Sequence, residues 1–132
     1  MKNMTGAKQE IAHAVKMIRK IGGKKIKFII LYGSYANENQ NPSSDIDLAV
    51  YYDGSKEERF KFRMKILGHV DDIFDIQIFQ DLPLYVKNEV LKGKILYGGE
   101  SRLIYELERR TYQDFDDFKN RFYDYIRGGV IG

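Results

Sequence analysis

The chain has no cysteine, no tryptophan, two prolines and two histidines among its 132 residues. Without cysteine, disulfides, thiolate nucleophiles and cysteine-ligated zinc are excluded. His13 and His69 are too few for a metal site built from several histidines. No apolar run approaches the ~20 residues of a membrane span, and the first ten residues lack an apolar signal core. We therefore expect a cytoplasmic protein without a membrane partner, whose chemistry comes from carboxylates, hydroxyls and cations.

The remaining composition is typical of one folded domain. Hydrophobic residues make up 43% of the chain and charged residues 31%, which is outside the range of disordered proteins. We expect a single domain over residues 1–132, with a core at about 5–100 and a C-terminal helix at about 101–127. The net charge of +3 suits a phosphate-bearing ligand, but it is too small to indicate a stable nucleic-acid partner.

Hydrophobic patterning predicts an α/β (α+β) chain with a small mixed sheet and helices packed on it. Ser55 followed by Glu58 is a capping box that opens one of the helices. Nearly continuous apolar character in the first two strands is typical of strands that are buried on both faces. Helices are expected at 5–21, from Ser55 to about Val70, after Pro83 and at 101–127, and strands at 25–32, 46–52, 73–79 and 94–97.

The last helix raises the question of a partner. Apolar residues recur at three- and four-residue spacing, and a helix of this length would measure about 40 Å, longer than a domain of this size is wide. One interpretation is a helix that covers the sheet. The other is a projecting half, with Phe118, Phe122 and Tyr125 on one stripe, that forms a homo- or hetero-oligomer.

The loop between the first two expected strands carries the most informative residues. Gly33 and Ser34 follow a buried strand directly. Glycine lets the backbone turn tightly and approach a ligand, and Ser34 offers a hydroxyl and a backbone N–H to an anion. By itself, the Gly-Ser pair is more often a plain turn.

Two carboxylates stand at the start of the second strand. Asp45 and Asp47 are two residues apart, so both side chains project from the same face of a strand. They could be polar residues of a solvent-facing edge strand, or ligands of Mg²⁺, which prefers carboxylate oxygens. Apolar residues directly downstream indicate a central strand, where two like charges need a cation between them.

Asp75 adds a third carboxylate. It stands among Phe74, Ile76 and Ile78 in the third expected strand, where an isolated acid has no structural use. If this strand lies beside the second, Asp75 would reach the same metal centre. Three carboxylates from two strands can hold a pair of Mg²⁺ ions, an arrangement that suits nucleotidyl transfer.

These residues carry a family resemblance over about residues 5–127. The pair Gly33-Ser34, ten intervening residues and then Asp45-Ile46-Asp47 resemble the signature of polymerase-β-type nucleotidyltransferases. The sequence around them is similar to that of the minimal nucleotidyltransferases, a branch that includes antitoxins paired with HEPN-domain toxins. The segment from Phe74 to Gly99 resembles the part of that family that carries the third acid.

The resemblance implies a polymerase-β-like nucleotidyltransferase fold and roles for individual residues. Gly33 and Ser34 would hold the phosphates of ATP or another nucleoside triphosphate. Asp45, Asp47 and Asp75 would ligate Mg²⁺, two ions by the family pattern, and Asp75 would also help deprotonate the acceptor hydroxyl. Many relatives carry a basic residue and glycine where this chain has Asn37-Glu38, which removes a phosphate contact.

The resemblance therefore implies a magnesium-dependent enzyme, similar to protein adenylyltransferases, that moves a nucleoside monophosphate to an acceptor hydroxyl. Within the family, the acceptor would be a tyrosine of a helical HEPN-type toxin, with this chain as the antitoxin. Two alternatives remain open: a small-molecule, antibiotic-type nucleotidyltransferase, and a non-catalytic module that binds nucleotide or masks the toxin. The absence of an evident second domain favours a macromolecular acceptor.

Overall fold

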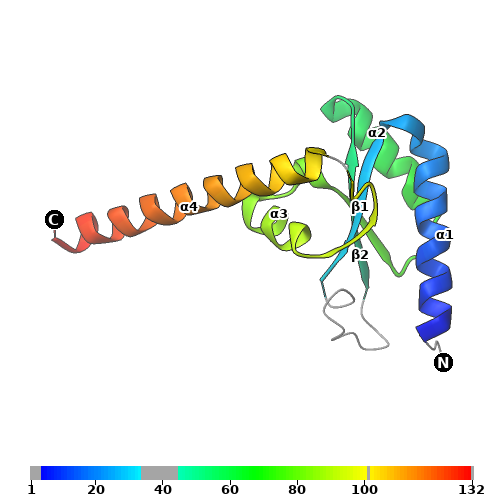
Figure 1. The fold of residues 1–132 in the computed structure, drawn as a ribbon, viewed down its shortest axis with the longest axis horizontal. Helices are drawn as coiled ribbons and strands as arrows, with labels where there is room; N and C mark the ends of the chain where they lie inside the picture. Colours follow the sequence, from blue (N-terminus) through cyan, green and yellow to red (C-terminus); the bar gives the residue numbers. More distant parts are fainter. Residues whose placement is uncertain (1–3, 34–44, 101, 132) are drawn as a thin grey trace.

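The structure is a computed structural model that describes residues 4–33, 45–100 and 102–131 (Figure 1). Four helices and four strands alternate much as the patterning predicts. The helices are α1 (Met4–Gly22), α2 (Lys56–Leu67), α3 (Leu84–Leu91) and α4 (Arg102–Ile131), and the strands are β1 (Ile26–Tyr32), β2 (Ile46–Tyr52), β3 (Phe74–Ile78) and β4 (Lys94–Tyr97). Short 3₁₀ turns, η1 (Gly23–Lys25) and η2 (Phe79–Asp81), precede β1 and follow β3. No helix among these residues is long and apolar enough to cross a membrane.

The strands form one mixed sheet in the order β3-β2-β1-β4. β1 pairs antiparallel with both β2 and β4, whereas β2 and β3 are parallel. Helix α2 connects the two parallel strands, as a crossover connection requires. Figure 1 shows α1 and α2 on one side of the sheet and α3 with the base of α4 on the other. The expected mixed sheet with helices packed on it is confirmed.

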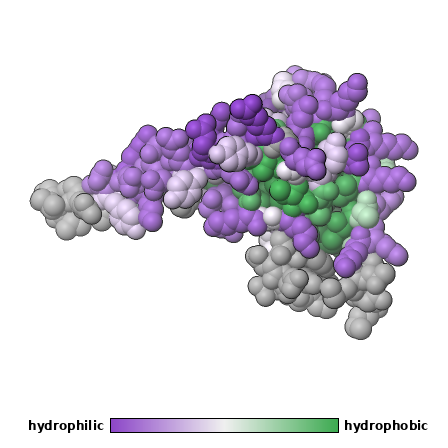
Figure 2. Space-filling view, in the orientation of Figure 1, coloured by the Kyte–Doolittle hydropathy of each residue, from purple (hydrophilic) through white to green (hydrophobic). Residues whose placement is uncertain are grey.

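Helix α4 packs on α3 only with its first turns and then projects away from the sheet (Figure 1). Ile104 and Thr111 are buried, whereas Phe118, Phe122 and Tyr125 are 60%, 52% and 79% exposed. The visible surface of the projecting part is mainly hydrophilic (Figure 2). The interpretation in which the helix covers the sheet is therefore wrong for its distal half, and the projection of that half is confirmed. Its role in a homo- or hetero-oligomer stays a prediction.

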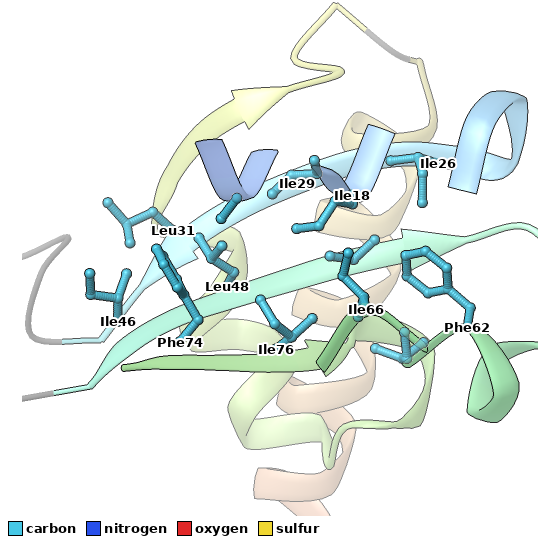
Figure 3. Packing of buried hydrophobic residues seen from close by; sticks show 13 residues of the cluster. Ile18, Ile26, Ile29, Leu31, Ile46, Leu48, Phe62, Ile66, Phe74 and Ile76 are labelled. Atoms are coloured by element: carbon cyan, nitrogen blue, oxygen red, sulfur yellow. The ribbon is translucent and has the colours of Figure 1, made fainter. Parts of the chain in front are cut away.

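Each face of the sheet has its own hydrophobic core. The larger core lies between the sheet and helices α1 and α2, and includes Ile18, Ile29, Leu48 and Ile66 (Figure 3). The smaller core lies on the α3 and α4 face and includes Phe28, Ile30, Ala49, Phe79, Val90 and Ile104. Both central strands therefore bury both faces, as their continuous apolar character predicts.

Two helix ends differ from expectation. Helix α2 ends at Leu67 rather than near Val70, because Gly68 forms the C-cap and its N–H bonds back to the Lys65 and Ile66 carbonyls. Helix α4 continues to Ile131, beyond the expected end near residue 127. The glycines at 128 and 129 lie inside the helix, because glycine lowers helix propensity without preventing helical geometry.

The predicted capping box at the start of α2 is confirmed. The Ser55 hydroxyl accepts from the Glu58 N–H at 3.2 Å, and the Glu58 carboxylate accepts from the Ser55 N–H at 3.0 Å. We expect Ser55→Ala to lower the free energy of unfolding by about 1 kcal/mol, since one helix N–H loses its partner. Urea unfolding measures this loss, and a Ser55→Thr variant, which keeps the hydroxyl, should retain most of the stability.

Candidate active site

The two acidic residues that lie within buried strands, Asp47 and Asp75, are side by side. Asp47 of β2 is in register with Asp75 of β3, on strands that run parallel about 4.8 Å apart. Both alternate with residues of the larger core, such as Leu48 and Ile76, so their side chains project from the opposite, α3 and α4 face of the sheet. The condition stated for Asp75, that its strand should lie beside the second, is met.

A tyrosine and a glycine at the end of β1 complete this row. Tyr32 pairs with Asp47 across the sheet, so Tyr32, Asp47 and Asp75 follow one another on three adjacent strands. Gly33 then turns the chain with φ +74°, a conformation that favours glycine. A Cβ at Gly33 would lie against the Asp47 carboxyl group, within 3.3 Å of its Cγ. A side chain at this position would therefore displace the Asp47 carboxylate or the turn.

Gln77 holds the Asp75 carboxylate in place. Its side-chain Nε2 donates to Asp75 Oδ1 at 2.8 Å, and both residues are half-buried on the same face of β3. The residue across from Gln77 on β2 is Ala49, whose small side chain leaves room for the amide. Asp75 is thus oriented by a contact from its own strand.

Burial and crowding of like charges raise two pKa values in this row. The pKa of Asp47 is raised from 3.8 to about 6 by burial, and then by the charges of Asp75 and Asp45 and a hydrogen bond with Asp75. The pKa of Tyr32 is raised to about 12 by burial and by the charges of Asp47 and Asp75. The site is therefore short of positive charge at neutral pH, which is the electrostatic setting that a divalent cation relieves.

This shift predicts how the stability of the metal-free protein depends on pH. The folded-state pKa of Asp47 exceeds its ordinary value, so the folded protein binds this proton more tightly than the unfolded chain does. The resulting stability is present below about pH 4 and is lost as the pH rises through about 6. Solvent screening at this half-exposed carboxyl reduces the loss to about 1 kcal/mol. In EDTA, Asp47→Asn should be more stable than the parent at pH 7.5, and urea unfolding at pH 4 should show little difference; an equal difference at both pH values would contradict this cause.

Of the other residues expected at the site, the structure describes Asp45 but not Ser34. Asp45 precedes β2, is exposed, and acts on Asp47 through its charge. Within the described residues, no group of three acids or histidines is arranged to hold a metal ion, so the three-carboxylate metal centre stays a prediction. Ser34 and the Asn37-Glu38 pair lie outside the described residues.

Tyr32 and Gln77 are the site residues that the sequence did not single out. Gln77 follows Asp75 at the two-residue spacing of a strand, a signal that was present in the sequence. Tyr32 ends a buried strand, where a tyrosine is usually a packing residue. Its place beside Asp47 depends on strand register, which sequence patterning alone does not specify.

Comparison with protein families identifies the class. The polymerase beta nucleotidyltransferase family matches residues 15–102, two thirds of the chain, a range that includes Gly33, Asp45, Asp47 and Asp75. The chain belongs to this family. The expected resemblance and the polymerase-β-like nucleotidyltransferase fold are confirmed.

Two relatives in Methanocaldococcus jannaschii are candidate protein adenylyltransferases. One is 39% identical over 80 residues, which cover 60% of this chain and 62% of the relative. The other is 30% identical over 81 residues, which cover 61% of this chain and 77% of the relative. The match thus spans less than two thirds of the length of the first relative.

Similar folds occur in solved toxin–antitoxin complexes. One chain of a toxin–antitoxin crystal structure with AMP-PNP superposes with a TM-score of 0.68 at 20% identity, covering 91% of this chain and 98% of that chain. One chain of a complex of tri-AMPylated Shewanella oneidensis HEPN toxin with MNT antitoxin gives a TM-score of 0.66 at 19% identity, covering 95% and 98%. At this identity, the likeness establishes a shared fold.

Proposed function

We propose that this protein is a magnesium-dependent nucleotidyltransferase that transfers AMP from ATP to a tyrosine hydroxyl of a helical, HEPN-type partner, and so acts as an antitoxin. The observation that carries the proposal is the pair Asp47 and Asp75, side by side on adjacent parallel strands next to the positive-φ Gly33. Family membership supports the reaction type. The names of the relatives and the AMPylated toxin in a structural neighbour support a protein acceptor.

The chemistry of Asp47 and Asp75 supports a magnesium site. Carboxylate oxygens are the ligands that Mg²⁺ prefers, and the pKa of Asp47 is raised by burial first and then by the charges of Asp75 and Asp45. Asp45, Asp47 and Asp75 would hold the metal, with two ions expected from the family pattern. When bound, Mg²⁺ would neutralise negative charge on the nucleotide phosphates and on the attacking and leaving oxygens of the in-line displacement.

The chain's own residues would bind the nucleotide and move one proton. Gly33 and Ser34 would hold the β- and γ-phosphates through backbone N–H groups and the serine hydroxyl. The acceptor oxygen forms a bond to the α-phosphorus while the bond from that phosphorus to the pyrophosphate oxygen breaks. Asp75, oriented by Gln77, takes the proton of the acceptor hydroxyl, and pyrophosphate leaves.

The proposed partner would dock along α4. Its projecting half carries exposed aromatic side chains, with the Phe118 and Phe122 rings stacked at 6.4 Å. Large exposed aromatic surface is typical of protein interfaces. The base of α4 lies on the same face of the sheet as the acids, so a helical partner seated there could present a hydroxyl to them. We assign the reaction to the cytoplasm, where ATP is available.

The proposal is tested with the product of the neighbouring gene as acceptor. The two proteins are incubated with α-labelled ATP and Mg²⁺, and label on the partner is mapped by tandem mass spectrometry. Label on a partner tyrosine, with equimolar pyrophosphate, is the expected result. An unlabelled partner that is still inhibited would favour a masking module, and labelling of a small molecule instead would favour the antibiotic-type enzyme.

Gln77 gives a further prediction about this reaction. We expect Gln77→Leu to lower kcat by about 10–100-fold, because Asp75 loses the amide that orients it. The KM for ATP should change little, and Mn²⁺ affinity measured with AMP-PNP should fall by a similar factor.

Gln80→Leu is the matched control. Gln80 bonds to the Tyr52 backbone N–H and carbonyl rather than to a carboxylate. Its loss should lower thermal stability while leaving Mn²⁺ affinity unchanged. Equal effects of the two variants on Mn²⁺ affinity would contradict a positioning role for Gln77.

A further inference from the structure

A groove runs along α1 on the face of the sheet opposite the acids. It consists of two adjoining hollows of about 560 and 440 Å³, which share Ala12 and Val15 in their walls. One wall is α1 with the turn that follows it, and the other is formed by β4. Figure 2 shows apolar surface over the strands in the middle of the molecule, with hydrophilic side chains around it.

The walls of this groove carry positive charge only. Six basic side chains line it and no acidic residue does: Lys8, Lys16, Arg19, Lys20, Lys24 and Lys94. Without these six, the chain would have 16 basic and 19 acidic residues, a net charge of −3 instead of +3. These six residues therefore account for the excess of positive over negative charge in the chain.

These cations lack the partners that basic residues have elsewhere in the fold. Lys25, Arg59 and Lys61 each form an ion pair with a nearby carboxylate. Within the described part of the chain, none of the six groove residues does so. Lys16 and Lys20 are four residues apart on α1, a spacing at which like charges destabilise a helix. The negative end of the helix dipole accounts for Arg19 and Lys20, but it does not account for Lys8 or Lys94.

The floor of the groove is apolar and comes from both elements. Ile11 and Val15 of α1 face Leu31 of β1 and Leu96 of β4. The one aromatic ring in the walls, Tyr97, has the Arg19 guanidinium over its face at 4.2 Å. That ring face is therefore not open for a nucleic-acid base to stack on, whereas the aliphatic floor can contact apolar side chains.

The outer edge of β4 is also open to a partner. β4 is the last strand of the sheet and pairs with β1 on its inner side only, among the strands that the structure describes. An extended peptide beside β4 would gain backbone hydrogen bonds and place alternate side chains toward the floor. Its other side chains would then meet the cationic walls.

We propose that the groove between α1 and β4 binds an extended, acidic segment of a partner protein, in which acidic and apolar side chains alternate. The positive walls select the charge of the segment, and the aliphatic floor selects its apolar side chains. The site lies on the opposite face of the sheet from Asp47 and Asp75, and it does not depend on the nucleotidyltransferase function.

The test uses a fluorescein-labelled (Glu-Val)₆ peptide and fluorescence anisotropy with the full chain. We expect saturable binding that weakens at least tenfold between about 50 and 300 mM NaCl, because the charges lie at the surface. A (Glu-Gly)₆ peptide, which keeps the charge but has no apolar side chains, should bind at least fivefold more weakly. A (Lys-Val)₆ peptide should not bind.

A pair of charge reversals locates the site. Lys16→Glu with Lys20→Glu should weaken (Glu-Val)₆ binding at least tenfold. Lys56→Glu with Lys65→Glu, which changes the net charge equally on exposed residues of α2, should weaken it less than threefold. Circular dichroism checks that both variants fold, and Lys8→Glu with Lys94→Glu replaces the first pair if it does not.

Three outcomes would overturn the proposal. The first is no binding of (Glu-Val)₆ at millimolar concentration. The second is equal weakening by the two pairs of reversals, which would mean unspecific attraction. The third is tighter binding of a (U)₁₂ RNA than of the peptide, which would indicate a nucleic-acid site. None of these outcomes affects the AMP-transfer assay, so the two proposals fail independently.

Discussion

Asp47→Asn is expected to reduce AMP transfer by on the order of 10³-fold or more. The substitution removes the carboxylate at the centre of the row formed by Tyr32, Asp47 and Asp75, and with it a proposed metal ligand. The amide is close in size to the carboxyl group, so the sheet should be preserved. Pyrophosphate release in the presence of Mg²⁺ and the partner measures the effect.

Asp53→Asn is the matched control for this prediction. Asp53 follows the opposite end of β2 and is exposed, and its Oδ2 lies 4.0 Å from Lys27 Nζ. The Asp53→Asn substitution changes the net charge by the same amount as Asp47→Asn. The activity of this variant should stay within about twofold of that of the parent. Asp47→Asn protein that keeps more than a tenth of the parental rate, while correctly folded, would contradict a metal-ligating role.

The second large effect is expected for Gly33→Ala. The backbone at Gly33 has φ +74°, and a Cβ there would lie against the Asp47 carboxyl group. Either the carboxylate or the turn must then shift. A misplacement of about 1 Å at reacting groups can lower the rate by about 10²-fold, and we expect a loss of at least that size.

Gly23→Ala separates backbone strain from displacement of the carboxylate. Gly23 also has a positive φ, +58°, but a Cβ there would meet nothing within 4 Å. This variant should lose about 1 kcal/mol of stability from strain alone and keep its activity. If Gly33→Ala also lost about 1 kcal/mol of stability and kept its activity, the close approach of Gly33 to Asp47 would have no role in the reaction.

Local features of the fold were predictable from the sequence. The strands at 46–52 and 94–97 and the Ser55–Glu58 capping box follow from patterns confined to a few residues, and the structure has them at the predicted positions. The ends of α2 and α4 were less predictable. They depend on how Gly68 and the glycines at 128 and 129 behave within a particular helix.

Which strands are neighbours could be predicted from the sequence only conditionally. The sequence of the third strand does not indicate which strand it pairs with or in which register, because strand pairing is non-local. The sequence therefore indicated that Asp75 would join Asp47 if their strands were adjacent. The contact from Gln77 to Asp75 and the place of Tyr32 beside Asp47 appear only once the register is known.

We propose that Asp47 and Asp75 hold the metal at which AMP transfer takes place. Anomalous diffraction from crystals of the protein with Mn²⁺ and AMP-PNP tests it most directly. We expect an anomalous peak about 2.0–2.2 Å from a carboxylate oxygen of Asp47 and of Asp75, next to the nucleotide phosphates. Bound nucleotide with no peak at these two carboxylates, or with its metal held elsewhere on the chain, would contradict it.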